Sequence, residues 1–220
     1  MAQLDLNDAE AAAWGQIAQV ARALARKDTA LQDDDMLPHP DKSKAKAEIL
    51  AAHYGGQDVT TLATQQFIHG DNIVISTSEL ACGDPWKGIL KSFSVIYRFN
   101  DGKIRGLVVP ESDGKFTLSP DGQVSEGESV AFVASNHSPP FPTPIEIHSV
   151  IYGKSQVEDE EVYKKLYYKF TRNDPIPITN EFFNKDPWFN VVKSAAIVYS
   201  FNGTVRSISG REGDDILFAL

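Results

Sequence analysis

Apolar and more polar positions alternate most regularly in residues 93–99 and 195–201. A period of two residues places one set of side chains on each face of a β-strand, so both stretches are predicted to be strands with one apolar face. Each stretch runs into a turn signal. Asn202-Gly203 is a preferred pair for a two-residue type I′ hairpin, and Asn100-Asp101-Gly102 is a longer version of it. A return strand is therefore expected after each turn.

The two strands belong to a longer pattern that occurs twice. Both copies read Asp-Pro-Trp, four residues, Lys-Ser, and then the strand with Tyr-x-Phe-Asn. The offset between the copies is 102 positions (86 to 188) for three pairs of identical residues: Trp86 and Trp188, Lys91 and Lys193, and Tyr97 and Tyr199. A fixed offset over many identities is the signature of a duplicated structural unit.

Each copy also carries a segment that the other lacks. Glu126-Gly127 is matched with Glu212-Gly213, which predicts an insertion of 15 residues in the first copy. This insertion is expected to form an extra hairpin around Phe116. The second copy gains residues within 155–169, where a helical turn or two is expected. Inserted loops on a rigid β scaffold often carry binding or catalysis.

The predicted fold class is mainly β, with two tandem homologous antiparallel β-sandwich-like domains preceded by an N-terminal α-helix. The predicted boundaries are 1–30 for the helix, 31–46 for a linker, 47–134 for the first β repeat, 135–145 for a proline-rich linker and 146–220 for the second β repeat.

The N-terminal helix is predicted to have one apolar stripe, formed by Trp14, Ile17, Ala21 and Leu24. Either this stripe packs on the rest of the chain, or it forms the seam of a homodimer.

Several short motifs of the repeat resemble a known domain. They are Tyr54-Gly55, Asp58-Val59-Thr60, Gly83-Asp84-Pro85, Lys91 and Val95-x-Tyr97. Together they resemble the C-terminal domain of DnaJ subfamily C co-chaperones (the eleventh member), and they are similar to motifs of uncharacterised fungal and bacterial proteins. The resemblance covers both repeats, although the second lacks Asp-Val-Thr and has Lys185 in place of Gly83. It implies a β-rich domain that acts in assembly or binding, and it supplies no catalytic residue.

The composition excludes some partners. The formal net charge is −9 and the pI is near 5.0. An acidic chain without a basic patch is a poor ligand for nucleic acid or for an anionic membrane surface. Cys82 is the only cysteine, so an intrachain disulfide is impossible. With no signal peptide or apolar span apparent in the sequence, we expect a cytoplasmic protein without a membrane partner.

The sequence offers few candidates for chemistry. The histidines lack the spacing of zinc ligands, and no phosphate-binding loop or nucleophile elbow is present, so we expect neither a metal nor a cofactor. His69 and Asp71 are the candidates for an acid–base pair. The candidate ligand-binding residues are the aromatic ones near the repeat-specific segments: Trp86, Phe116, Tyr163, Tyr167 and Tyr168. For the tryptophans, a core role is the alternative that we favour.

Two classes of function stay open. The leading hypothesis is a non-enzymatic binding or assembly protein, which holds a small molecule or a protein partner in a cleft between the two domains. The alternative is a cofactor-independent cyclase or isomerase, with an aromatic-lined pocket and an Asp or His as proton donor. A deep pocket with an ionisable group would favour the enzyme, and a flat apolar patch would favour assembly.

Overall fold

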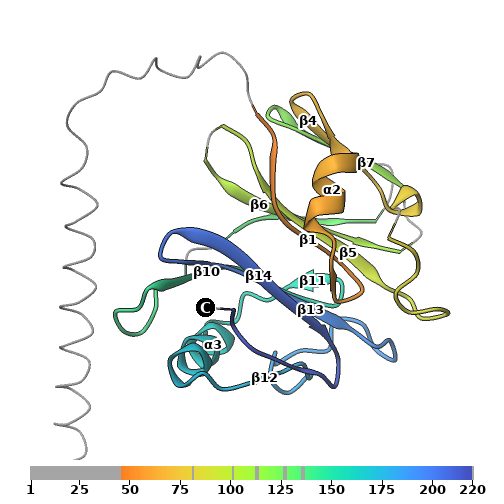
Figure 1. Ribbon diagram of the computed structural model, residues 1–220. Helices are drawn as coiled ribbons and strands as arrows, with labels where there is room; N and C mark the ends of the chain where they lie inside the picture. Colours follow the sequence, from red (N-terminus) through yellow and green to blue (C-terminus); the bar gives the residue numbers. More distant parts are fainter. Residues whose placement is uncertain are drawn as a thin grey trace, which may run out of the picture. The chain divides into compact units, whose positions relative to one another are not determined.

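The computed structural model describes residues 46–80, 82–100, 102–111, 114–125, 128–134 and 137–219 (Figure 1). The predicted N-terminal helix, its dimer seam and nearly all of the linker that follows lie outside these residues, as do Glu126 and Gly127. The described part of the chain is mainly β, with antiparallel sheets and two α-helices.

The first half of the described chain contains the following elements: β1 (Glu48–Tyr54), β2 (Gln57–Asp58), α2 (Thr60–Phe67), β3 (Ile68–His69), β4 (Asn72–Ser76), the 3₁₀ helix η1 (Thr77–Glu79), β5 (Ser92–Arg98), β6 (Ile104–Pro110), β7 (Lys115–Ser119), β8 (Gly122–Ser125) and β9 (Val130–Val133). The strand order β2-β1-β5-β6-β9 makes sheet A, and β3-β4-β7-β8 makes sheet B. The hairpin β7–β8 is the one predicted around Phe116.

The second half contains β10 (Ile145–Tyr152), β11 (Ser155–Gln156), α3 (Glu160–Arg172), β12 (Ile176–Pro177), β13 (Ser194–Phe201), β14 (Thr204–Arg211) and β15 (Asp215–Ile216). The strand order β11-β10-β13-β14 makes sheet C, and β12 pairs with β15. The turn between β13 and β14 has two residues with positive φ, Asn202 at 50° and Gly203 at 78°, as a type I′ hairpin requires.

The sheets are covered differently in the two halves. Sheet B and α2 pack on sheet A around the first core, which includes Phe67, Phe93 and Phe116. In the second half α3 packs on sheet C through Val162, Tyr163, Leu166 and Tyr167. Only the first half is therefore a sandwich of two large sheets. A helix takes the covering place in the second half, and it is longer than the one or two turns expected.

Local sequence explains why α3 forms where it does. The Asp159 side chain accepts a 2.9 Å hydrogen bond from the amide of Glu161, which is a typical N-cap. The first turn is acidic and the last turn carries Lys169 and Arg172, so both ends complement the helix dipole. Asn173 adopts a left-handed conformation (φ 51°) and ends the helix by donating to the carbonyls of the last turn.

Sheets A and C pack on each other through small and medium apolar residues. The cluster between them contains Ala51, Ile96, Val108, Ile151, Ala196 and Val198. Ile96 and Ala196 lie between the alternating residues that face the two larger cores, so β5 and β13 are buried on both faces. Two hydrogen bonds from side-chain hydroxyls to backbone carbonyls extend this contact. Ser92 Oγ donates to the Gly153 carbonyl at 2.7 Å, and Ser209 Oγ donates to the Gly56 carbonyl at 3.0 Å.

Candidate functional site

The repeated motif of the first half folds around a buried lysine. The Lys91 side chain is only 1% exposed, and its Nζ lies 2.8 Å from Asp84 Oδ1 and 2.9 Å from Glu111 Oε1. It also donates to the carbonyl oxygens of Ile89 at 2.7 Å and Trp86 at 3.2 Å. Asp84 in turn accepts from the Trp86 amide at 2.9 Å. The Asp-Pro-Trp turn and the lysine are thus parts of one corner, which we call the Lys91 corner.

The second half builds the same corner around Lys193. Its Nζ lies 3.2 Å from Asp186 Oδ1 and 3.1 Å from Glu212 Oε2, and it donates to the Val191 carbonyl at 2.9 Å. The geometry also corrects the sequence match made for Glu212. The glutamate that takes its place in the first half is Glu111, which directly follows β6 as Glu212 follows β14.

The charges of the Lys91 corner stabilise each other. Burial disfavours the Lys91 ammonium, but its hydrogen bonds to Asp84 and Glu111 outweigh this effect and raise the pKa of the lysine. The hydrogen bond from Lys91 lowers the pKa of Asp84. Tyr54 donates a 2.6 Å hydrogen bond to Glu111, and burial together with this bond raises the pKa of the phenol. Each shift moves the pKa of the group further from neutral pH. Groups with such pKa values are suited to a structural ion pair and less suited to proton transfer.

The two tryptophans of the motif differ in burial. Trp86 is 5% exposed and lies under the guanidinium of Arg211, whereas Trp188 is half-buried, with Lys154 Nζ 5.8 Å from its ring centroid. Trp86, a candidate ligand-binding residue, is therefore enclosed by the packing of the second half. Its indole Nε1 is buried without a hydrogen-bond partner.

The other predicted site residues lie far apart in the fold. Phe116 is fully buried on β7, in the core between sheets A and B. Tyr163 and Tyr167 are fully buried on the inner side of α3. The Tyr163 hydroxyl donates to the Val157 carbonyl, and the Tyr167 hydroxyl donates to the His137 carbonyl. Tyr168 is 49% exposed on the outer side of the helix. The ligand-binding role of these four residues stays a prediction.

His69 and Asp71, the candidate acid–base pair, are exposed at the hairpin between β3 and β4. Their catalytic role also stays a prediction. The tyrosine helix α3 packs on the face of sheet C opposite to sheet A (Figure 1). The first-half loops and the tyrosines of α3 are thus separated by the sheets.

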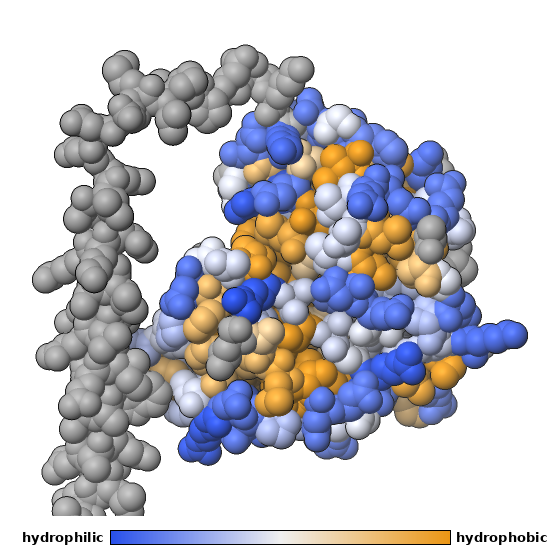
Figure 2. Space-filling view, viewed as in Figure 1, coloured by the Kyte–Doolittle hydropathy of each residue, from blue (hydrophilic) through white to orange (hydrophobic). Residues whose placement is uncertain are grey.

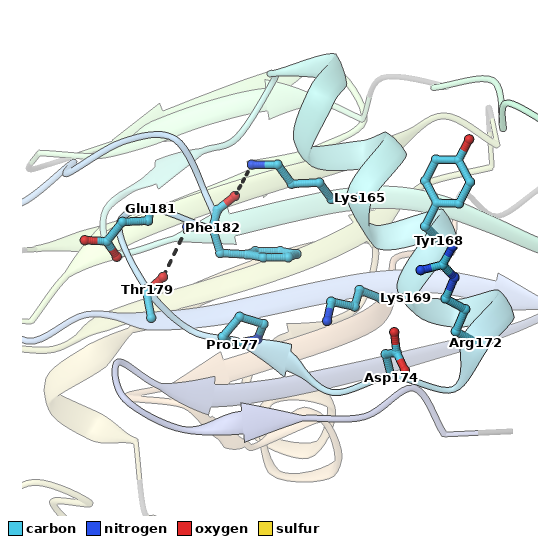
Figure 3. Close-up of a pocket in the computed structure, with 9 residues that line it drawn as sticks. All are labelled: Lys165, Tyr168, Lys169, Arg172, Asp174, Pro177, Thr179, Glu181 and Phe182. Carbon is cyan, nitrogen blue, oxygen red and sulfur yellow. Dashed lines mark hydrogen bonds between the residues drawn. The ribbon is translucent and has the colours of Figure 1, made fainter.

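The second half of the chain forms a pocket at a different place. A hollow of about 660 Å³ lies between the C-terminal half of α3 and the segment 177–182 (Figure 3). We call it the α3 groove. Its lining residues are Lys165, Tyr168, Lys169, Arg172, Asp174, Pro177, Thr179, Glu181 and Phe182. In the space-filling view of Figure 2, hydrophilic and hydrophobic side chains are mixed on the lower part of the molecule, where α3 lies.

One cation of the α3 groove holds the groove together. Lys165 Nζ donates to the Phe182 carbonyl at 3.3 Å and to Asn184 Oδ1 at 3.0 Å, and it lies 5.7 Å from the centroid of the Phe182 ring. The Phe182 amide donates to Thr179 Oγ1 at 3.1 Å. These bonds fix the position of the segment opposite the helix, and Figure 3 shows both that involve Phe182.

The remaining charged side chains of the α3 groove have no bonded partner among the described residues. Within the described part of the chain, the side chains of Lys169, Arg172, Asp174 and Glu181 make no hydrogen bond or ion pair. The two cations stand in the last turn of α3, where the helix dipole favours them. Both also line a hollow with an apolar floor, and Lys169 extends into it (Figure 3), which is what a ligand site needs.

The sequence contained one signal of the α3 groove, which is the spacing of its cations. Lys165, Lys169 and Arg172 are separated by four and three residues, so a helix places them on one side. The segment was predicted to form only a helical turn or two. A helix that short would not place all three cations on one side. The acidic and apolar residues of the opposite wall come from a loop, whose position the sequence does not give.

Among the described residues, no group of three or more His, Cys, Asp or Glu side chains is arranged to hold a metal ion. None of the described helices is long and apolar enough to cross a membrane. Comparison with known proteins gives no match to any protein family, curated protein or solved structure.

Proposed function

We propose that this chain is a non-enzymatic binding protein, and that its ligand is an anion with an apolar body that occupies the α3 groove. The observation that carries the proposal is that Lys169 and Arg172, at a hollow of about 660 Å³, have no hydrogen-bond or ion-pair partner among the residues that the structure describes. Pockets for small molecules commonly have volumes of roughly 300–1,000 Å³. The volume is thus sufficient for a small organic anion or for a few residues of a peptide.

The cations supply the polar part of the recognition. A guanidinium presents two parallel N–H groups to a carboxylate, and an ammonium adds a compact charge beside it. The chain as a whole carries a net charge of −9, so cations without a partner stand out against the remaining surface. They would attract an anion to the α3 groove.

The apolar part of the recognition comes from three rings. Phe182 is almost fully buried at the floor of the α3 groove, and Pro177 and the half-exposed ring of Tyr168 border it. Apolar surface of this kind favours a ligand with a hydrocarbon or aromatic body, because its burial removes both surfaces from water. The bonds from Lys165 hold the floor in place before a ligand arrives, which reduces the ordering cost of binding.

The same geometry favours binding over the alternative of a cyclase or isomerase. Such an enzyme needs a proton donor whose pKa lies near the working pH. In the Lys91 corner, where a buried lysine lies between two carboxylates, the pKa of Lys91 is raised and that of Asp84 is lowered, so both lie further from neutral pH.

We also infer that the two halves arose by tandem duplication. Besides the two lysine corners, β1 and β10 each carry a register shift at the same place, between Ile49 and Ala51 and between Ile147 and Ser149. The expected cleft between the halves is occupied by the apolar cluster of sheets A and C. The proposed site therefore lies on α3, an element that is larger in the second half. A cytoplasmic location, expected because no signal peptide or apolar span is apparent in the sequence and consistent with the single cysteine Cys82, belongs to the same proposal.

The test is to titrate the protein with hippurate, an aromatic carboxylate, and with hippuramide, its uncharged amide, by isothermal calorimetry. We expect hippurate to bind and the amide to bind at least tenfold more weakly. Arg172→Gln and Lys169→Gln should each weaken hippurate binding by tenfold or more. Lys164→Gln is the matched control, because Lys164 stands on the same helix and pairs with Glu161 outside the groove. Equal binding of acid and amide, or unchanged binding by both groove variants, would overturn the proposal.

A further inference from the structure

A second hollow lies at the Lys91 corner of the first half. It has a volume of about 320 Å³, and its wall includes Tyr54, Asp84 and Glu111 of the corner. The hollow shares no lining residue with the α3 groove. Its volume is at the lower end of the range for small-molecule pockets, roughly 300–1,000 Å³, so a ligand with one ring and a short chain would suit it. We call it the corner hollow.

The corner hollow carries an excess of negative charge. Asp84 and Glu111 share one cation, the buried ammonium of Lys91. The Asp84 side chain is 44% exposed, and the oxygen that accepts from Lys91 and from the Trp86 amide is Oδ1, which leaves Oδ2 without a bonded partner among the described residues. Lys87, the other cation near Asp84, is exposed and does not line the hollow. A ligand cation would therefore find a carboxylate oxygen that is still free to accept a hydrogen bond.

Other groups of the wall suit a ligand with both a polar and an apolar part. Thr77 lines the hollow and is 8% exposed, and its hydroxyl makes no hydrogen bond within the described residues. Buried hydroxyls in proteins normally have a partner, which a ligand would supply here. Leu80 and the ring of Tyr54 are almost fully buried and add apolar surface.

The second half contains a counterpart of this place, and there the chain itself fills it. In the second corner Tyr152 takes the position of Tyr54, since it ends β10 as Tyr54 ends β1. Asn180 Oδ1 accepts a 2.9 Å hydrogen bond from the Tyr152 hydroxyl, and the Phe183 ring stacks on the Tyr152 ring with the centroids 4.5 Å apart. A polar amide and an aromatic ring thus cover the second corner.

The first half has shorter side chains at the corresponding positions. The strands that precede the two walls match at an offset of 103 positions (75 to 178), and at this offset Asn180 corresponds to Thr77 and Phe183 to Leu80. A shorter polar side chain and a shorter apolar one leave space beside Tyr54, and this space is the corner hollow. The second half supplies a hydrogen-bonding group and an aromatic ring from its own chain, and a ligand would supply both in the first half.

We propose that the corner hollow binds a small organic cation, a primary ammonium that is joined to one aromatic ring by a short chain. The ammonium is bound by Asp84, whose charge is only partly neutralised by Lys91. The ring packs on Leu80 and takes the place that Phe183 fills in the second half. This site is additional to the α3 groove and does not depend on it.

The experiment compares three probes by isothermal calorimetry on the full chain. They are phenethylammonium, phenethyl alcohol, which has the same body without the charge, and ethylammonium, which has the charge without the ring. We expect phenethylammonium to bind. The alcohol should bind more weakly by about tenfold or more, because the charge-assisted hydrogen bond to Asp84 is lost. Ethylammonium should also bind more weakly by about tenfold or more, because no ring is buried.

Three variants locate the site. Asp84→Asn should weaken phenethylammonium binding by about tenfold or more. Asp186→Asn is the matched control and should leave binding unchanged, because it breaks the equivalent ion pair in the second half, where the chain covers the corner. Thermal unfolding checks that both variants are folded, and their stability losses should be similar. Leu80→Phe keeps both carboxylates but brings a ring into the corner hollow, so it should abolish binding.

Several outcomes would overturn the proposal. Equal binding of the alcohol and the ammonium, or unchanged binding by Asp84→Asn, would show that no cation is recognised. An equal loss in Asp84→Asn and Asp186→Asn would show that the effect of charge is not local to the corner hollow, and full binding by Leu80→Phe would place the ligand elsewhere. Arg172→Gln should bind phenethylammonium as the unaltered chain does, and a loss there would move the ligand to the α3 groove. The hippurate titration tests the proposed function separately, so either proposal can fail without the other.

Discussion

The guanidinium carbon of Arg211 lies 4.7 Å from the centroid of the Trp86 ring, and its Nη2 donates a 3.1 Å hydrogen bond to the Pro85 carbonyl. The contact joins the last residue of β14 to the Asp-Pro-Trp turn of the first half. In the second half the cation over the ring is Lys154, whose Nζ lies further away, 5.8 Å from the centroid of Trp188, and Trp188 stays half-buried although the two turns have the same sequence. Identical motifs thus acquire different environments through their neighbours.

The first prediction concerns these two tryptophans. Trp86→Ala should lower the free energy of unfolding by about 3–5 kcal/mol, because it removes a buried aromatic ring. Trp188→Ala should cost clearly less, since part of that ring is already in water. Urea unfolding followed by circular dichroism measures both values. Equal losses for the two variants would contradict the difference in burial.

The second prediction concerns the buried lysines. Lys91→Met should destabilise the chain by about 3 kcal/mol, because Asp84 and Glu111 would lose the cation that holds them together. Lys193→Met should show a similar loss, since its ammonium also pairs with two carboxylates, those of Asp186 and Glu212. The control is Lys164→Met, which breaks an exposed pair with Glu161 and should leave the free energy of unfolding almost unchanged. Chemical denaturation of all three variants decides the matter.

The third prediction is a pH dependence that comes from His53. This imidazole is buried at the contact between the halves, 3.2 Å from Ser207 Oγ. Burial lowers its pKa from 6.5 to about 4, an effect that the nearby Asp58 only partly offsets. Above pH 6.5 the ring is neutral in both states, so it contributes no pH dependence there. Between pH 6.5 and 4 only the unfolded chain takes up the proton, so stability should fall by roughly 3 kcal/mol and then level off.

The variant His53→Gln isolates this effect, because glutamine can still bond to Ser207 but does not titrate. Its unfolding free energy should fall less steeply between pH 6.5 and 4 than that of the unaltered chain. His69→Gln, at an exposed hairpin, is the control and should leave the slope as it is. If His53→Gln has the same pH profile as the unaltered chain, the histidine is not the source.

The fourth prediction uses two glycines with similar backbone angles. Gly56 has φ 77° and Gly70 has φ 63°, so alanine at either position is strained by about 1 kcal/mol. A Cβ at Gly56 would also lie 2.9 Å from the carbonyl oxygen of Gly210, whereas a Cβ at Gly70 would meet nothing within 4 Å. Gly56→Ala should therefore lower the melting temperature distinctly more than Gly70→Ala. Similar shifts would mean that the halves do not approach closely there.

Period and turn chemistry were sufficient to predict much of the fold. The alternation in residues 93–99 and 195–201, followed by glycine turns, gave the central strands β5 and β13, and the extra hairpin of the first half was found around Phe116. These features depend on neighbours along the chain. The second buried face of β5 and β13 was not predicted, because Ser94 and Ala196 are small enough to fit either a solvent face or a close sheet contact.

The candidate site was less accessible to prediction. The tyrosines of α3 were expected to contact a ligand, but helix periodicity turns Tyr163 and Tyr167 toward sheet C and leaves Tyr168 outside. The helix α2, over Thr60–Phe67, was not predicted either, since it is short and has no side-chain N-cap. The opposite wall of the α3 groove depends on tertiary contacts of Phe182, which no local pattern encodes.

The small residues between sheets A and C have a consequence for how the chain melts. Ala51, Ala196 and Val198 give each sheet a second face that water would meet if the other sheet were absent. An isolated half would expose this strip and would tend to aggregate along it. The two halves should therefore unfold together, in one calorimetric transition whose van't Hoff and measured enthalpies agree. What the sequence repeats as two units would then behave in solution as a single cooperative one.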